Sequence, residues 1–133
     1  MLRLESGITS NGMIRSILLV ALGGAVGSVC RYLVSRMMES SFPWGTLTVN
    51  IIGSLLIGLL VGLTSKDIVS QEMKLLLVTG FCGGFTTFST FANESFGMMK
   101  AGDALQMALY VSASVVIGIL AVWAGMNLSE TIK

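Results

Sequence analysis

Long uncharged stretches follow one another along the chain. Lys, Arg, Asp and Glu are absent from residues 16–30, 40–65, 75–93 and 104–129. A helix that crosses a bilayer needs about 20 mostly apolar residues. The last three stretches reach about that length, and the first falls short with 15 residues, so the arginines that flank it must reach the interface or be satisfied within the bundle.

Only helices and closed barrels satisfy their backbones in lipid, and nothing in this sequence alternates between apolar and polar residues with a period of two. The pattern predicts an all-α integral membrane protein of four transmembrane helices.

Turn residues and capping residues place the helix ends. We expect helices at about 13–37, 45–64, 71–99 and 103–126. Ser70 and Asp103 stand where their side chains can cap the third and fourth helices.

These helices make one transmembrane domain over residues 13–127, with an N-terminal extension over 1–12 and a C-terminal tail over 128–133. We interpret 1–12 as an extension rather than as the polar leader of a cleaved signal peptide, because the apolar run lacks a clear cleavage pattern and three more spans follow.

Composition narrows the classes of function. Only 11% of the 133 residues are charged, against roughly 25% in a soluble domain, so the lipid bilayer is the expected surrounding. A net charge of +1 without a basic cluster argues against a nucleic-acid partner. The chain has no histidine, no close carboxylate pair and no nucleophile beside a base, so we expect no enzyme. Cys30 and Cys82 lie within apolar stretches, which disfavours a disulfide framework or a zinc site.

Positive charge is nearly balanced across the membrane. One side holds five Lys and Arg residues and the other holds three, namely Arg31, Arg36 and Lys100. Such a weak bias permits insertion in both orientations and an antiparallel homodimer, although a single orientation is the alternative.

Small residues recur at four-residue spacing in three of the helices. The stripes are Gly23 and Gly27; Thr46, Asn50, Ser54, Gly58 and Gly62; and Tyr110, Ser114 and Gly118. Such stripes let helix backbones approach closely in lipid, so we interpret them chiefly as packing seams.

The third helix contains an unusual segment from Thr79 to Phe91. Three glycines in five positions are followed by four hydroxyl residues, Thr86, Thr87, Ser89 and Thr90. We expect a helix break here, whose freed carbonyls must line a cavity or hold a cation. Packing alone could account for the glycines but not for the hydroxyl residues.

Aromatic and amide side chains accompany this segment. Phe85, Phe88 and Phe91 are spaced to share one helix face, where they could be simple core or could turn their positive ring edges toward an anion. Asn50 is an amide in the middle of an uncharged span. It could make an interhelical hydrogen bond, but with the hydroxyl residues nearby we favour a pore donor.

Glu94 and Arg31 are the two charges that could lie away from the interfaces. Ionisable groups within a membrane usually mark functional sites. Glu94 could sit near a vestibule, and a structural ion pair or cap is an equal alternative.

Together these residues resemble the Fluc (CrcB-type) fluoride channels. The resemblance rests on the run from Gly80 to Phe91, on Asn50, on Gly23–Gly27 followed by Arg31, and on Trp44–Leu47, and it spans about 14–125.

The resemblance implies a dual-topology antiparallel homodimer with two pores, exporting fluoride passively across the plasma membrane, or the inner membrane of a Gram-negative cell. It implies pore-lining roles for Phe88, Phe91, Asn50, Ser89, Thr90, Thr46, Glu94, Tyr110 and Ser114. It also implies a structural sodium ion held by the backbone carbonyls of Gly83 and Thr86, and a vestibule position for Arg31. Gly118 departs from the polar track that the family often carries in helix four.

Two other classes compete with a channel. A small proton-coupled multidrug exporter also has four helices, but it needs a carboxylate deep in its first helix, whereas Glu94 is late in the third. A non-transporting membrane scaffold would not need the donors at Asn50, Ser89 and Thr90.

Overall fold

The computed structural model describes residues 10–133, and within that range the chain is built of helices and turns without strands. The elements are α1 (Ser10–Met37), α2 (Trp44–Ser65), α3 (Gln71–Lys74), the π-helix η1 (Leu75–Cys82), α4 (Gly83–Phe85), α5 (Phe88–Lys100) and α6 (Ala104–Glu130). Elements α3 to α5 together form the third span, so the described residues contain four helices long and apolar enough to cross a membrane. The predicted all-α, four-span fold is confirmed.

The helix ends differ modestly from those predicted. α1 begins at Ser10 rather than at 13, and residues 1–9 of the predicted extension lie outside the described residues. α6 continues to Glu130 rather than ending at 126. The Lys66 ammonium explains the longer α6, because it donates to Ser129 O at 2.8 Å and Ile132 O at 2.9 Å and so satisfies carbonyls at the helix end.

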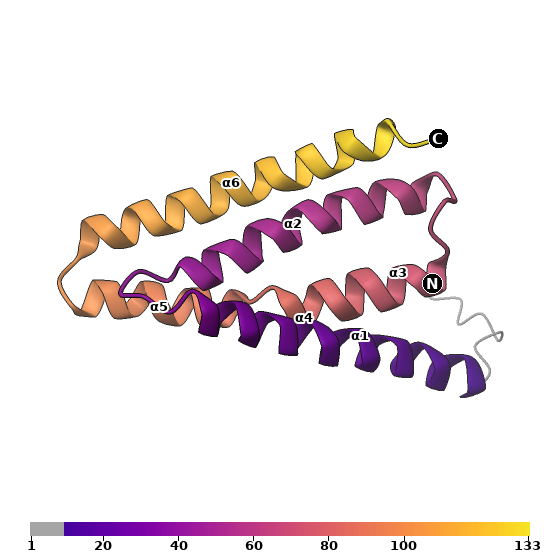
Figure 1. Cartoon of the computed structure of the whole chain (residues 1–133), viewed down its shortest axis with the longest axis horizontal. Helices are drawn as coiled ribbons and strands as arrows, with labels where there is room; N and C mark the ends of the chain where they lie inside the picture. The colour runs from indigo at the N-terminus through magenta and orange to yellow at the C-terminus, as the bar shows by residue number, and fades with distance from the viewer. Residues whose placement is uncertain (1–9) are drawn as a thin grey trace, which may run out of the picture.

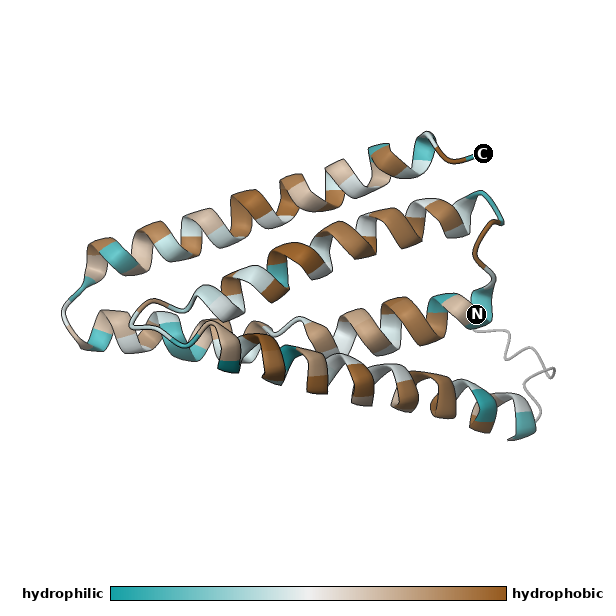
Figure 2. Cartoon of the chain, viewed as in Figure 1, coloured by the Kyte–Doolittle hydropathy of each residue, from teal (hydrophilic) through white to brown (hydrophobic). Residues whose placement is uncertain are grey.

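The spans pair along their lengths. α6 lies against α2, while α1 lies against η1 and α4 of the third span (Figure 1). Apolar residues run along all four spans and hydrophilic residues gather toward the ends and connections (Figure 2). Leu22 on α1 and Trp123 on α6 are exposed by 62% and 65%, as expected of side chains that face lipid.

Glycines allow α1 to touch the backbone of the third span. A Cβ added at Gly23 would overlap the carbonyl oxygen of Leu76, and one added at Gly27 would overlap that of Phe81. The same contact recurs between α2 and α6, where a Cβ at Gly58 would overlap Val122 O. Close approach of this kind drives helix association in lipid, so the predicted packing seams are confirmed at these positions.

The predicted caps are also confirmed. The Ser70 hydroxyl accepts from Met73 N at 3.2 Å, and Asp103 Oδ1 accepts from Gln106 N at 3.1 Å. Gly102 turns the chain before α6 with φ of +80°, a conformation that glycine adopts without strain.

Candidate functional site

Two threonines, rather than the glycines, interrupt the third span. Thr86 and Thr87 are extended, with φ/ψ of −87°/159° and −151°/116°. The break predicted within the segment from Thr79 to Phe91 is confirmed, and it lies at the hydroxyl residues rather than at the glycines. Gly80 and Gly84 stay helical because they pack against α1, where a Cβ at Gly84 would overlap Gly24 O.

Side chains from α1, from α2 and from the break itself satisfy most of the opened backbone. Asn50 Nδ2 donates to Thr87 O at 3.1 Å, and Asn50 Oδ1 accepts from Thr87 N at 2.8 Å. Thr87 Oγ1 accepts from Thr90 N at 3.2 Å and thereby caps α5. Arg31 Nε donates to Gly84 O at 3.0 Å. The break is therefore held in a defined geometry by α1 and α2.

Two carbonyl oxygens at the break stay uncommitted. In a continuous helix, Gly83 O and Thr86 O would accept from Thr87 N and Thr90 N. Those N–H groups donate instead to Asn50 Oδ1 and Thr87 Oγ1. Gly83 O and Thr86 O consequently receive no hydrogen bond from residues 10–133. Sodium sites in membrane proteins use unwound carbonyl oxygens at a helix break as ligands. The two free carbonyl oxygens therefore fit a cation.

A cavity of about 270 Å³ opens beside the break. Its walls come from α2, the break, α5 and α6, and are formed by Asn50, Ser54, Ile57, Thr86, Thr87, Phe88, Phe91, Ser114 and Val115. None of these side chains is charged. Ser114 Oγ is buried without a hydrogen-bond partner in the described part of the chain. The cavity therefore offers neutral donors to whatever enters it.

The aromatic rings divide between two places. Phe88 and Phe91 lie 5.9 Å apart between centroids, and the Phe91 ring lies 5.2 Å from that of Tyr110. Phe85 precedes the break and stacks on Phe81 at 5.5 Å. The predicted single face of three phenylalanines is thus wrong for Phe85, because the extended threonines interrupt the helical spacing.

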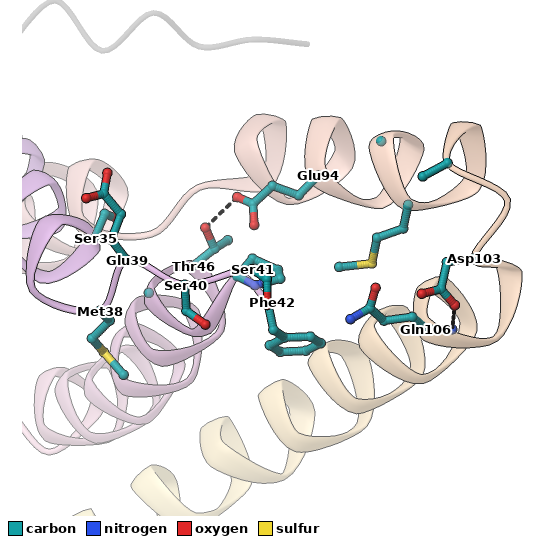
Figure 3. A pocket seen from close by; sticks show the side chains of 15 residues that line it. Ser35, Met38, Glu39, Ser40, Ser41, Phe42, Thr46, Glu94, Asp103 and Gln106 are labelled. Carbon is teal, nitrogen blue, oxygen red and sulfur yellow. Dashed lines mark hydrogen bonds between the residues drawn. The ribbon is translucent and has the colours of Figure 1, made fainter.

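A second, outer pocket of about 500 Å³ lies where the α1–α2 connection meets α5 and the start of α6. Figure 3 shows Glu94 reaching from α5 toward Thr46 on α2, whose hydroxyl donates to Glu94 Oε1 at 2.6 Å. Tyr110 donates to Glu94 Oε2 at 3.4 Å from α6. Glu94 makes no ion pair among the described residues, so its partners are hydroxyls from two other spans.

The structure groups the predicted residues unevenly. Asn50, Phe88, Phe91 and Ser114 meet at the cavity, and Thr46 and Glu94 meet at the outer pocket. Tyr110 lies between the two groups through its contacts with Phe91 and Glu94.

Besides Tyr110 and Gly83, three predicted residues are absent from the walls of both the cavity and the outer pocket. Ser89 is exposed on the first turn of α5, and Thr90 Oγ1 accepts a hydrogen bond from Thr87 Oγ1 at 3.0 Å. Arg31 lies at the Gly84 carbonyl and does not line the outer pocket. Their roles in permeation stay predictions.

Sequence reasoning missed Ser54 as a site residue. Ser54 stands four residues after Asn50 on α2 and lines the same cavity. The four-residue spacing was the available signal, but the same spacing is typical of a packing seam.

Comparison with known proteins places this architecture. A model of the family described as CrcB-like protein, Camphor Resistance (CrcB), matches residues 18–126. The chain belongs to the CrcB family. The resemblance expected from the sequence is thereby confirmed, and with its four spans this CrcB-family chain is a multi-pass protein of the plasma membrane.

Relatives in the CrcB family match over almost their full length. The Fluoride-specific ion channel FluC of Phocaeicola vulgatus is 48% identical over 120 residues, which are 87% of this chain and 99% of the relative. The protein of the same name from Agrobacterium fabrum is 50% identical over 122 residues, 88% of this chain and 98% of the relative. The protein of the same name from Flavobacterium psychrophilum is 41% identical over 121 residues, which are 87% of this chain and 98% of the relative.

Proposed function

We propose that this chain is a fluoride-selective ion channel, not an enzyme, through which fluoride leaves the cytoplasm passively. The observation that carries the proposal is the match, over nearly its whole length, to relatives named as fluoride-specific ion channels. Because a channel does no work on the ion, fluoride flows down its electrochemical gradient, and export results when that gradient points out of the cytoplasm.

The chemistry of the cavity supports this proposal. A bare anion in a low-dielectric interior costs on the order of tens of kcal/mol unless donors replace its water. Asn50 has a second amide N–H beyond the one given to Thr87 O, and Ser114 has an uncommitted hydroxyl. The ring edges of Phe88 and Phe91 carry partial positive charge, as the hydrogen-bond donors do, and so also attract an anion. Neutral donors suit conduction, because the ion must be able to leave again.

The proposed path runs from the cavity toward the outer pocket. Phe91 lines the cavity and packs on Tyr110, whose hydroxyl reaches Glu94 in the outer pocket. Thr46 also lines the outer pocket, where its hydroxyl donates to Glu94. The path therefore stays within groups contributed by α2, α5 and α6.

Two pores in an antiparallel homodimer are the proposed assembly. Phe88 borders the cavity, yet 79% of it is exposed in the single chain, so the cavity wall is incomplete there. A two-fold interface brings the same patch of each subunit together, which would complete both cavities at once. The nearly balanced positive charge of the loops permits the opposite insertion that such a dimer needs.

A structural sodium ion at the dimer centre is proposed at the break. Gly83 and Thr86 would hold it through their uncommitted carbonyl oxygens, with the same pair from the second subunit. A sodium ion bound there would supply fixed positive charge near the paths without occupying them.

Purified protein tests the function in liposomes that are loaded with potassium fluoride and treated with a potassium ionophore, so that potassium balances the charge that fluoride carries out. We expect fluoride efflux, followed with a fluoride electrode, far above that of protein-free liposomes, and no comparable efflux from liposomes loaded with chloride. Absence of fluoride efflux contradicts the channel. Drug export that Glu94→Gln abolishes would favour a proton-coupled exporter, and variants of Phe88 that disturb only dimerisation would favour a scaffold.

Thermal unfolding in detergent tests the sodium site separately from flux. We expect a higher unfolding midpoint in sodium chloride than in the chloride of a large organic cation at equal ionic strength. Thr86→Val removes the hydroxyl that donates to Cys82 O at 2.8 Å but keeps the carbonyl, so the sodium effect should persist in it. Equal midpoints in both salts contradict the site.

A further inference from the structure

Ser54 on α2 carries a hydroxyl without a partner. It makes no hydrogen bond with residues 10–133, whereas Thr64, farther along the same helix, donates to Leu60 O at 2.8 Å. Donation to the preceding turn is the usual way in which a helix satisfies a Ser or Thr hydroxyl. The Ser54 hydroxyl is therefore free to bond to something outside its own helix.

The cavity beside the break is where this hydroxyl lies. Ser54 follows Asn50 by one turn on α2, and both line the cavity together with Ser114 of α6. Ser114 Oγ is buried and likewise lacks a partner in the described chain. Two uncommitted hydroxyls from different helices thus border the same cavity.

Gly118 of α6 leaves room beside Ser54. A Cβ built at Gly118, one turn beyond Ser114, would lie 3.8 Å from Ser54 Oγ and would meet no closer atom. A side chain at 118 would therefore share the space that the Ser54 hydroxyl has to itself.

We propose that Ser54 is a further anion-coordinating residue of this cavity, whose hydroxyl donates to fluoride beside Ser114 in the space that Gly118 leaves open. The inference rests on the proposed channel function. A polar group without a partner in a membrane interior is costly, and an ion that shed its water would take up both hydroxyls. The Asn50 amide one turn away would supply the next donor along the path.

A pair of variants with the same shape tests Ser54. Ser54→Thr keeps the hydroxyl and Ser54→Val replaces it with a methyl group, so any difference between them reports the hydroxyl alone. Loss of one hydrogen bond to a charged partner corresponds to roughly tenfold. We expect Ser54→Val to slow fluoride efflux from liposomes by about that factor relative to Ser54→Thr. Thr64→Val, whose lost hydroxyl bonds only to its own helix, should match the unchanged chain.

A rescue experiment separates coordination from folding. Ser54→Ala should slow efflux, and Ser54→Ala with Gly118→Ser should recover most of it, because a serine side chain at that position places a hydroxyl in the same space. Size-exclusion profiles that match the unchanged chain establish that each variant is folded. Equal efflux through Ser54→Val and Ser54→Thr, with the unchanged chain conducting, overturns the role of Ser54 and leaves the channel standing. No fluoride efflux through the unchanged chain overturns both.

Discussion

The Asn50 amide joins two spans through both of its hydrogen-bonding groups, donating to Thr87 O and accepting from Thr87 N. From sequence alone, an interhelical bond and a pore donor were alternatives. The structure shows the interhelical bond. Asn50 also lines the cavity, so its second amide N–H is still available as a pore donor. Sequence singled out Asn50 because an amide is rare in an uncharged span. It could not single out Ser54, because a serine in a small-residue stripe has the same pattern whether its hydroxyl is used or free.

The substitution Asn50→Asp is a direct test at this scale. The aspartate side chain has nearly the same shape and still accepts from Thr87 N, but it loses the donors and adds negative charge to an anion path. We expect fluoride efflux to fall by at least about tenfold, since a hydrogen bond to a charged partner contributes about 1.5–3 kcal/mol.

The matched control is Asn127→Asp, at an exposed amide that donates to Trp123 O near the end of α6. It should conduct like the unchanged chain. If Asn50→Asp also conducts normally while remaining folded, Asn50 is a structural residue only.

At the scale of elements, the third span departs most from its sequence-based description. Sequence predicts one helix over 71–99 with a break, and the structure has α3, the π-helix η1, α4, an extended pair and α5. A run of apolar residues has the same pattern in an α-helix and a π-helix, so η1 could not be foreseen. From sequence alone, the glycines suggested the break. In the structure they let the third span approach the backbone of α1, and sequence could not show that contact.

Alanine at Gly27 tests whether close contact between α1 and η1 fixes this geometry. Its Cβ would overlap Phe81 O, a backbone atom that cannot move aside as a side-chain end could. Overpacking typically costs about 1–3 kcal/mol, and we expect a loss at or above that range, measured as a lower unfolding midpoint in detergent.

Gly97→Ala is the control for helix propensity. A Cβ at Gly97 meets nothing within 4 Å, and alanine favours an α-helix interior over glycine by roughly 0.5–1 kcal/mol. Its midpoint should be unchanged or higher. If Gly27→Ala is as stable as Gly97→Ala, α1 and η1 can move apart at this seam without loss of stability.

For the whole molecule, sequence identified the four spans because hydropathy is a local property, but it left their pairing undetermined. Small-residue stripes occur in several helices, so they indicate seams without indicating partners. The structure pairs α2 with α6 and α1 with the third span. The five-to-three balance of positive residues remains the only signal for orientation.

Dual insertion is testable with one added cysteine. Ala101→Cys lies exposed in the turn between α5 and α6. In intact cells, we expect a membrane-impermeant maleimide to label about half of the molecules, because the charge bias is too weak to select one side. Permeabilised cells define complete labelling, and the unchanged chain, with Cys30 and Cys82 inside spans, defines the background. Labelling of all molecules or of none contradicts dual insertion.

The pairing of α2 with α6 also has a consequence for biosynthesis. Spans leave the ribosome in chain order, so α2 enters the membrane before its main partner has been made. During that interval its glycine seam at Gly58 and Gly62 lacks the partner that it meets in the folded chain. The seam is covered only when α6 arrives, and the cavity beside the break gains the wall that Ser114 of α6 supplies at the same moment. A nascent chain halted before α6 would therefore hold the break but lack the α6 wall of the cavity.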